Sequence, residues 1–333
     1  MSSDLLHGGA LDLMQQRFAG APTPWIDLST GINPWPYPDI QASSEAYAHL
    51  PTKTLYKTCQ NAMAQVIGTQ RENIALAPGS ELLIRLLPTI LSAETIAIQS
   101  PTYSDHARVW RTAGRTVIET AEPLSLADQV DAIVICQPNN PDGRIFSQEA
   151  INDAMAQLRR KTGWLIVDEA YADLSPGLSL VPHVNRGNLI VLRSFGKFFG
   201  LAGLRLGGLI APPFVISKMR QRLGEWPVSG AALEIGARAY ADLAWQDQTR
   251  KKLNRARLAL DDTLDQAGFK NISGTDLFRY IEAPGKAHAL WAHLAQSGIY
   301  TRRFDWTQDY LRLGLPRDQN SVARLQVALS LSA

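Results

Sequence analysis

Residues 189–197 read Leu-Ile-Val-Leu-Arg-Ser-Phe-Gly-Lys, a short apolar run followed at once by polar residues and glycine. Such a run predicts a strand that is buried on both faces, as in a parallel sheet covered by helices. Similar runs occur at 95–99, 132–136 and 164–167, and helical patterns alternate with them. The alternation predicts an α/β fold with a mostly parallel sheet between two layers of helices.

The polar residues that follow these runs form a candidate site, because ligands of such sheets bind beyond the carboxyl ends of the strands. Taken singly, each has an ordinary explanation as a turn residue, a helix cap or a surface charge. Their order along the chain makes function the better interpretation. They are Asn140 in Pro-Asn-Asn-Pro-Asp-Gly at 138–143, Asp168 and Tyr171 after the run at 164–167, Ser194 and Lys197 after 189–192, and then Arg205.

As a set, these segments resemble the fold-type-I pyridoxal-phosphate (PLP) enzymes, the aspartate aminotransferase superfamily. The marks are an Asn-Pro-x-Gly turn, Asp-x-x-Tyr at a strand end, and Ser-x-x-Lys followed by an arginine. The resemblance covers about 25–315 and implies a PLP-dependent transferase type I fold with a smaller α+β domain. We expect an N-terminal segment at 1–30 that packs with the small domain, a large PLP-binding domain at 31–213, and a small C-terminal domain at 214–333.

The resemblance implies that PLP is the cofactor and that Lys197 holds it as a Schiff base. A free lysine is a poor nucleophile at neutral pH, so its surroundings must activate it. Asp168 matches the carboxylate that pairs with the pyridine nitrogen, which keeps the ring an electron acceptor. Tyr171 and Asn140 match the groups that hydrogen-bond the ring's O3′ oxygen. Tyr103 matches the aromatic residue that stacks on the ring.

The cofactor phosphate is assigned by the same resemblance to two places in the sequence. Ser194 and Arg205 match phosphate ligands, and arginine offers a planar bidentate fork. Gly79, Ser80 and Glu81 open a predicted helix whose free N–H groups can hold an anion.

Arg312 is a candidate both from its pattern and from the resemblance. In Tyr-Leu-Arg-Leu-Gly-Leu at 310–315 the leucines line one face of a strand, so Arg312 points to the other face, alone. The pattern leaves a solvent-facing arginine equally open. In the superfamily this position binds the substrate α-carboxylate.

Two subfamilies with phosphorylated substrates are most similar: histidinol-phosphate aminotransferases and the L-threonine-O-3-phosphate decarboxylases of cobalamin biosynthesis. His7-Gly8-Gly9 and Asp-Leu-Ser-Thr-Gly-Ile-Asn-Pro at 27–34 resemble segments of the decarboxylases. This favours decarboxylation of L-threonine O-3-phosphate to (R)-1-amino-2-propanol phosphate, with aminotransfer as the alternative. Candidate substrate ligands are His7, Asn33, Arg302 and Arg312, and Arg303 is an alternative to Arg302 for the substrate phosphate.

A homodimer is implied, because the superfamily builds its sites at a two-fold interface. Histidinol-phosphate aminotransferases usually carry a tyrosine that reaches the partner's cofactor phosphate, and Leu50 stands at that position here. The departure weakens the aminotransferase interpretation and puts this cross-subunit contact in doubt, although Tyr37 or Tyr56 are possible substitutes.

Composition excludes several other classes of protein. The net charge is +2, and the basic run at 250–257 has the pattern of a solvated helix face, so no nucleic-acid partner is expected. No stretch approaches the roughly 18 apolar residues that span a bilayer. Cys59 and Cys136 lack metal-site spacing, so we expect no metal and a cytoplasmic location. A dinucleotide enzyme is disfavoured, because no Gly-x-Gly-x-x-Gly follows the first strand.

Overall fold

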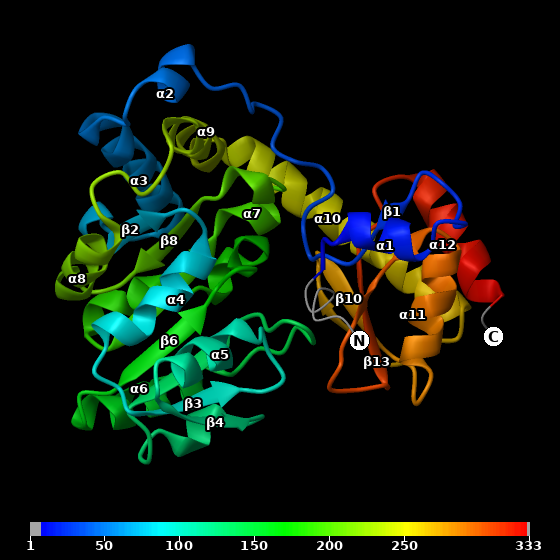
Figure 1. Cartoon of the computed structure of the whole chain (residues 1–333). Helices are drawn as coiled ribbons and strands as arrows, with labels where there is room; N and C mark the ends of the chain where they lie inside the picture. The colour runs from blue at the N-terminus through cyan, green and yellow to red at the C-terminus, as the bar shows by residue number, and fades with distance from the viewer. Residues whose placement is uncertain (1–7, 332–333) are drawn as a thin grey trace. The chain divides into compact units, whose positions relative to one another are not determined.

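The computed structural model describes residues 8–331, which divide into two compact units by the density of their contacts (Figure 1). The large unit comprises 36–140 and 144–246. The small unit comprises 8–35, 141–143 and 247–331. The turn at 141–143 thus belongs to the small unit, although the strand before it belongs to the large one.

A seven-stranded sheet with the order β2-β8-β7-β6-β5-β3-β4 forms the centre of the large unit. Only β8 runs in the opposite direction to the other strands of this sheet, so the expected mostly parallel sheet is confirmed. The apolar runs become fully buried strands because helices cover the sheet. The strands are β2 (Ile74–Ala77), β3 (Thr95–Gln99), β4 (Thr116–Thr120), β5 (Ala132–Cys136), β6 (Trp164–Asp168), β7 (Leu189–Ser194) and β8 (Gly207–Ile210).

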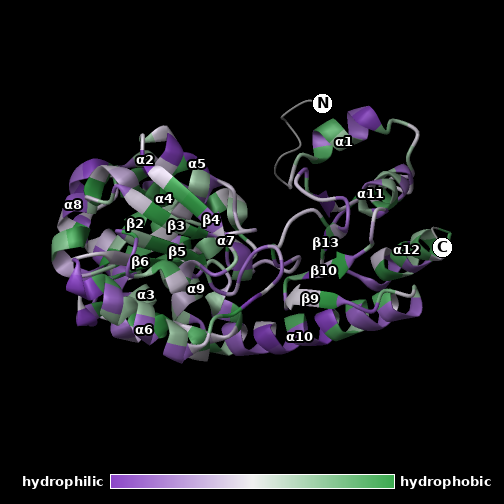
Figure 2. Cartoon of the chain, turned by 90° about the horizontal axis from the view of Figure 1, so that it is seen from below, coloured by the Kyte–Doolittle hydropathy of each residue, from purple (hydrophilic) through white to green (hydrophobic). Residues whose placement is uncertain are grey.

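Helices surround this sheet, and Figure 2 shows apolar strands enclosed by helices whose outer residues are hydrophilic. Side chains of α4, α5 and α8, such as Leu87, Trp110 and Met219, form one buried cluster with the strands. The helices of this unit are α2 (Ser44–Ala48), α3 (Lys53–Ile67), α4 (Ser80–Ile90), α5 (Asp105–Thr112), α6 (Gln148–Arg160), α7 (Phe195–Phe198), α8 (Pro213–Leu223) and α9 (Gly230–Ala241). By contact density α8 and α9 group with the large sheet, and the predicted domain boundaries at 30 and 213 stay a prediction.

Two parts of the large unit are not evident from the sequence pattern. The glycine-rich segment at 203–208 precedes Ile210, and its last two residues belong to β8. Its glycines give no apolar pattern, and they are needed because a Cβ on Gly207 would lie 2.5 Å from the Ser80 nitrogen. The helical pattern of the sequence at 233–267 is divided into α9 and α10 (Leu243–Gln266). Asp242 separates them, and its carboxylate accepts a hydrogen bond from the Trp245 nitrogen as an N-cap.

The small unit contains a four-stranded antiparallel sheet with the order β12-β13-β10-β9 and a separate parallel pair, β1 with β11. The strand-like segment at 299–303 forms two short strands in different sheets, because β11 pairs with β1 whereas β12 pairs with β13. The N-terminal region contains α1, although its many proline, glycine and tryptophan residues are typical of irregular structure. The elements are α1 (Leu11–Arg17), β1 (Ile26–Asp27), β9 (Ile272–Thr275), β10 (Phe278–Glu282), α11 (Ala287–Gln296), β11 (Ile299–Tyr300), β12 (Arg302–Arg303), β13 (Tyr310–Gly314) and α12 (Gln319–Ser330).

Within residues 8–331, no helix combines the length and the apolar character that a membrane span requires. The same part of the chain contains no group of three or more His, Cys, Asp or Glu side chains placed to hold a metal ion.

Candidate active site

Asp168 ends β6 and is buried at the carboxyl edge of the sheet. Its Oδ2 lies 3.0 Å from His106 Nε2, and its Oδ1 accepts a hydrogen bond from the Ala170 nitrogen. His106, on α5, is also buried, and its Nδ1 has no hydrogen-bond partner among the described residues. The sequence reasoning missed His106. The signal that would have found it is its place three residues after Tyr103, on the helix that opens beyond β3.

Lys197 lies on α7, the short helix that follows β7 without a break. Buried aromatic rings pack around this short helix. Phe195 stacks on Phe199 with ring centroids 4.4 Å apart, and Tyr240 of α9 meets the Phe199 ring edge-on at 5.1 Å. Phe198 is buried beside them. The aromatic cluster fixes the backbone under Lys197, whose own side chain is only half-buried.

Three further residues predicted to contact the cofactor lie at the same sheet edge. The Tyr103 ring meets the His106 ring edge-on at 6.0 Å, and burial followed by the charge of Asp105 raises the pKa of the Tyr103 hydroxyl. Tyr171 is buried in the turn after Asp168. Asn140 is half-buried after β5, whereas the side chain of the preceding residue, Asn139, bonds to Thr102 and to the Pro101 carbonyl. Asn140 is thus the asparagine with exposed surface in this turn.

The predicted phosphate ligands form a narrow cradle at the start of α4. Gly79 precedes the helix with a φ of +90°, and a Cβ there would lie only 2.6 Å from Arg205 Nη2. Arg205 itself adopts the left-handed conformation, which directs its guanidinium to this helix end. Ser194 lies on the strand beside it, paired with Gly207. A glycine backbone, free helix N–H groups and a guanidinium together fit a phosphate.

Glu81, in the first turn of α4, contributes differently from the other members of the cradle. Its carboxylate accepts a hydrogen bond from Arg85 Nη2 at 2.8 Å and lies 3.8 Å from Arg205 Nη2. A carboxylate repels a phosphate, so the backbone N–H of Glu81 is the group that suits the predicted role.

In the small unit, Arg312 of β13 is buried, and its Nη2 donates to the Ser29 carbonyl at 2.8 Å. The sequence pattern indicated that Arg312 is alone on its face of the strand, and this is wrong. Arg302 of β12 is its register partner. Burial, and then the positive charge of Arg312, lowers the pKa of the Arg302 guanidinium to about 10. Two adjacent guanidiniums under mutual repulsion form a natural binding site for anions.

The two N-terminal segments that resemble the decarboxylases meet at Ser29. The Gly9 nitrogen donates to Ser29 Oγ at 2.9 Å, and a Cβ on Gly8 would lie 2.3 Å from the Ser29 carbonyl oxygen. Asp27 Oδ1 accepts from the Ser29 nitrogen at 2.8 Å. This places a tightly packed backbone next to the carbonyl that receives the Arg312 hydrogen bond.

The remaining predicted substrate ligands are placed less directly. Asn33 is buried, and its Oδ1 accepts a hydrogen bond from the Trp35 nitrogen at 2.9 Å. Arg303 lies 4.7 Å from the Trp291 ring and 3.7 Å from an Asp305 carboxylate oxygen, so it is engaged away from Arg312. His7 lies outside the described residues.

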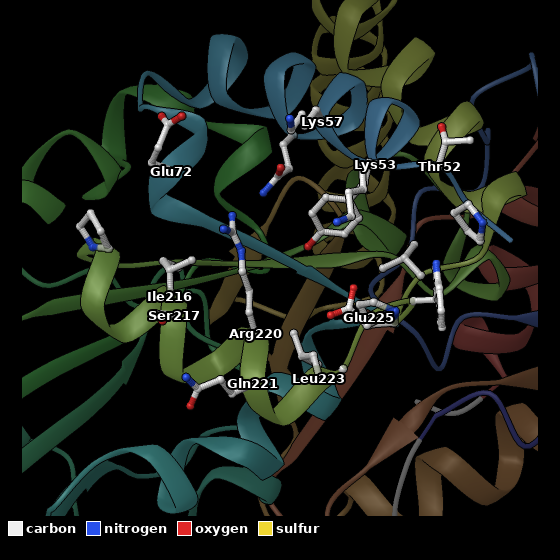
Figure 3. A pocket seen from close by; sticks show the side chains of 18 residues that line it. Thr52, Lys53, Lys57, Glu72, Ile216, Ser217, Arg220, Gln221, Leu223 and Glu225 are labelled. Atoms are coloured by element: carbon white, nitrogen blue, oxygen red, sulfur yellow. The ribbon is translucent and has the colours of Figure 1, made fainter.

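A cavity of about 710 Å³ lies elsewhere on the large unit, between α3 and α8 (Figure 3). Its lining includes Arg220, Trp226 and Tyr56, one of the two tyrosines considered above for a cross-subunit contact, but none of the predicted PLP or substrate ligands. Its walls carry both lysine and glutamate side chains, and they lack the strand-end constellation. We therefore assign the candidate active site from the strand-end chemistry.

Comparison with known proteins places the chain in a family. The model of the aminotransferase class I and II family matches residues 23–326. A threonine-phosphate decarboxylase from Sinorhizobium sp. is 38% identical, with 99% of each chain covered. A second one, from Pseudomonas aeruginosa, is also 38% identical, with 98% of this chain and 97% of the relative covered.

Among solved structures, the histidinol-phosphate aminotransferase from Sinorhizobium meliloti in complex with pyridoxal-5′-phosphate superposes with a TM-score of 0.81. It shares 19% identity, and the match covers 96% of this chain and 93% of that one. This likeness confirms the type I fold expected from the sequence. Together with the family match over most of its length, it leads to one conclusion: the chain belongs to the aminotransferase class I and II family.

Proposed function

We propose that this protein is a PLP-dependent carboxy-lyase that converts L-threonine O-3-phosphate to (R)-1-amino-2-propanol phosphate, a reaction of cobalamin biosynthesis. The full-length likeness to two threonine-phosphate decarboxylases supports this function. The observation that carries it is the packing of Gly8 and Gly9 on Ser29, whose carbonyl accepts from Arg312. The segments typical of the decarboxylases thereby support the arginine expected to bind the substrate.

The large unit supplies groups that fit PLP. When bound, the cofactor supplies a conjugated, electron-accepting ring that stabilises the negative charge left on Cα when a bond to it breaks. The cradle of Gly79, Ser80 and Arg205 suits its phosphate. Lys197 Nζ would bind it covalently, and Tyr171 and Asn140 would donate hydrogen bonds to its ring oxygen.

Asp168 would hold a proton on the ring nitrogen of the cofactor. A buried carboxylate does this well, since it is an acceptor with little competing water. His106 keeps Oδ2 of Asp168 in place, while the Ala170 nitrogen holds Oδ1. These two contacts fix the orientation of the Asp168 carboxylate in the absence of a ligand. Its remaining lone pairs are then available in a fixed direction.

The small unit supplies cations for the two anionic ends of the substrate. Arg312 would bind the α-carboxylate, and Arg302 would bind the phosphate, which relieves the repulsion between the two guanidiniums. In the reaction the Cα–carboxylate bond breaks, carbon dioxide leaves and a proton replaces it on Cα. Lys197 Nζ is the group proposed to move that proton.

The reaction can be tested with the purified protein, PLP and L-threonine O-3-phosphate, with and without 2-oxoglutarate. We expect carbon dioxide release at the same rate in both samples, and 1-amino-2-propanol phosphate as the product. Glutamate formed from 2-oxoglutarate and histidinol phosphate, without carbon dioxide release from threonine phosphate, would instead establish the aminotransferase alternative and overturn the proposal.

We also propose that the protein is a homodimer. Leu50, Tyr47 and Trp226 are large apolar side chains with more than half of their surface exposed. Pro51, next to Leu50, lines the same cavity as Trp226. Light scattering of the purified protein tests the proposal: twice the chain mass of 36.6 kDa is expected, and a monomer at micromolar concentration would refute it. A cytoplasmic location stays a prediction.

A further inference from the structure

A buried ionic cluster of Arg193, Glu169 and Asp173 lies directly beside the strand-end residues. Arg193 Nη1 donates to Glu169 Oε2 at 2.8 Å, and Arg193 Nη2 donates to Asp173 Oδ1. All three side chains are at most 6% exposed. None of them takes part in the chemistry proposed above, so their burial requires a separate explanation.

The position of the cluster in the sequence is informative. Glu169 directly follows Asp168, and Asp173 comes two residues after Tyr171, so the two carboxylates lie on either side of the turn that carries Tyr171. Arg193 lies on the neighbouring strand β7, immediately before Ser194. One guanidinium thus connects both sides of the turn after β6 to the end of β7.

The turn is also held from its other side. Glu169 accepts hydrogen bonds from the Leu180 nitrogen at 2.6 Å and from Ser179 Oγ at 2.7 Å. Its backbone carbonyl accepts from the Ala172 nitrogen at 3.1 Å. These hydrogen bonds hold the Glu169 carboxylate in place independently of Arg193. The Arg193 guanidinium, which binds this carboxylate, is thereby held in place on β7.

Charge and geometry explain why the connecting residue is an arginine. Burial alone would lower the pKa of Arg193, but Asp173 and Glu169 together raise it, so the guanidinium stays charged. A buried ionic cluster is a weak source of stability, since apolar residues of similar size often replace one at no loss. A planar fork between two carboxylates, by contrast, fixes distance and direction, which a lysine cannot reproduce.

We propose that Arg193 is a positioning residue, which sets the turn carrying Asp168 and Tyr171 in register with the strand end carrying Ser194 and Lys197. The inference rests on the proposed cofactor role of Lys197. It does not depend on which reaction the bound cofactor then supports.

The first experiment compares Arg193→Lys with wild type in the PLP-loaded enzyme. We measure kcat and KM for threonine phosphate, and we titrate the absorption band of the bound cofactor against pH. A misplacement of about 1 Å can cost up to about 100-fold, so we expect kcat to fall roughly 10- to 100-fold, with KM changed less than about threefold. The midpoint of the cofactor titration should shift. Arg111→Lys, in an exposed pair with Glu119, is the matched control and should change none of these.

A second variant separates positioning from stability. The combination Arg193→Met, Glu169→Gln and Asp173→Asn removes all three charges together, so no unpaired buried charge is left to destabilise the fold. We expect the melting temperature of this triple variant to be close to that of wild type. Its kcat and its cofactor titration should differ from those of wild type, as in Arg193→Lys. Recovery of all three would mean that the cluster only stabilises the protein, and the proposal would be overturned.

The readouts also distinguish a failure of this inference from a failure of the proposed function. A protein that binds PLP but releases no carbon dioxide still gives the cofactor titration, which alone then tests Arg193. A wild-type titration in both Arg193→Lys and the triple variant overturns the positioning role. If Arg193→Lys does not fold, the triple variant and Asp173→Asn, which weakens only one arm of the fork, give the same test.

Discussion

The large and the small unit both present cationic side chains near candidate ligand groups, but the charges around these cations are opposite in sign. Arg193 of the large unit is clamped between two carboxylates, which raise its pKa. Arg302 of the small unit is paired in register with another arginine, and its pKa is lowered to about 10. The first arrangement is complete in the protein alone. In the second, two guanidiniums of like charge are neighbours, although Tyr300 and Asp305 partly offset the repulsion on Arg302.

The difference indicates which of the proposed binding groups are oriented before a ligand binds. Asp168, with His106 and Ala170 as partners, is oriented without any ligand. In the role proposed for them, the arginines of the small unit would instead bind the two anionic groups of the substrate. A site of this kind favours a phosphorylated amino acid over an unphosphorylated one.

The largest expected effect comes from removing Lys197, the proposed attachment point of the cofactor in the large unit. Lys197→Ala should lower kcat/KM by about 10³-fold or more, because it removes both the covalent anchor and the proposed proton carrier. Steady-state assays of carbon dioxide release check this. Lys218→Ala, on α8, is the control and should retain wild-type activity. Retention of more than a tenth of the activity in Lys197→Ala would be incompatible with the assigned role.

Removing Arg312, the residue of the small unit proposed to bind the substrate carboxylate, should have the next largest effect. Arg312→Gln should lower kcat/KM for threonine phosphate by about 10²-fold, since a buried charge-assisted contact is lost. The absorption spectrum of the PLP-loaded enzyme without substrate should not change, because the role proposed for Arg312 is to bind the substrate and not the cofactor. An altered cofactor spectrum with unchanged substrate kinetics would reverse the assignment.

Arg302→Gln should give a smaller and more distinctive result. We expect KM for threonine phosphate to rise about tenfold, a loss typical of one ionic contact. The variant should lose no thermal stability, since it removes a repelled charge. Arg193→Met should instead destabilise the protein by about 3–5 kcal/mol. Thermal unfolding of the two variants compares the two regions directly, and equal destabilisation would contradict the contrast drawn above.

The pH dependence of anion binding sharpens the same point. The folded-state pKa of Arg302 lies below its ordinary value, so its charge opposes folding below about pH 10, and this penalty disappears as the pH rises further. In the PLP-loaded protein, inorganic phosphate should therefore raise the melting temperature more below pH 10 than above it, because the contribution of Arg302 is lost above that pH. A phosphate effect that is unchanged in Arg302→Gln would exclude Arg302 as its origin.

The smallest expected effect concerns His106. His106→Asn removes one of the two donors that orient Asp168, but the Ala170 nitrogen still holds the carboxylate. We expect kcat to fall only about threefold, together with a shifted cofactor absorption band. Spectra and kinetics of the same preparation test this, and an unchanged band would show that His106 does not act on Asp168.

Sequence reasoning identified the strand-end residues because each follows an apolar run, and such runs become the strands of a covered parallel sheet. It missed β8, since glycines chosen for close backbone approach leave no apolar periodicity. It missed His106 and the Arg193 cluster, because the partners come from distant segments and their relation is purely spatial. It also treated Arg312 as alone, since strand pattern does not reveal that β12 brings Arg302 beside it.

The central claim is that the strand-end residues form a PLP site centred on Lys197. The most direct test is to reduce the PLP-loaded protein with borohydride, digest it and locate the pyridoxyl group by mass spectrometry. We predict one modification per chain, on the peptide that contains Lys197. Stoichiometric modification of a different lysine, with Lys197 unmodified, would contradict the account.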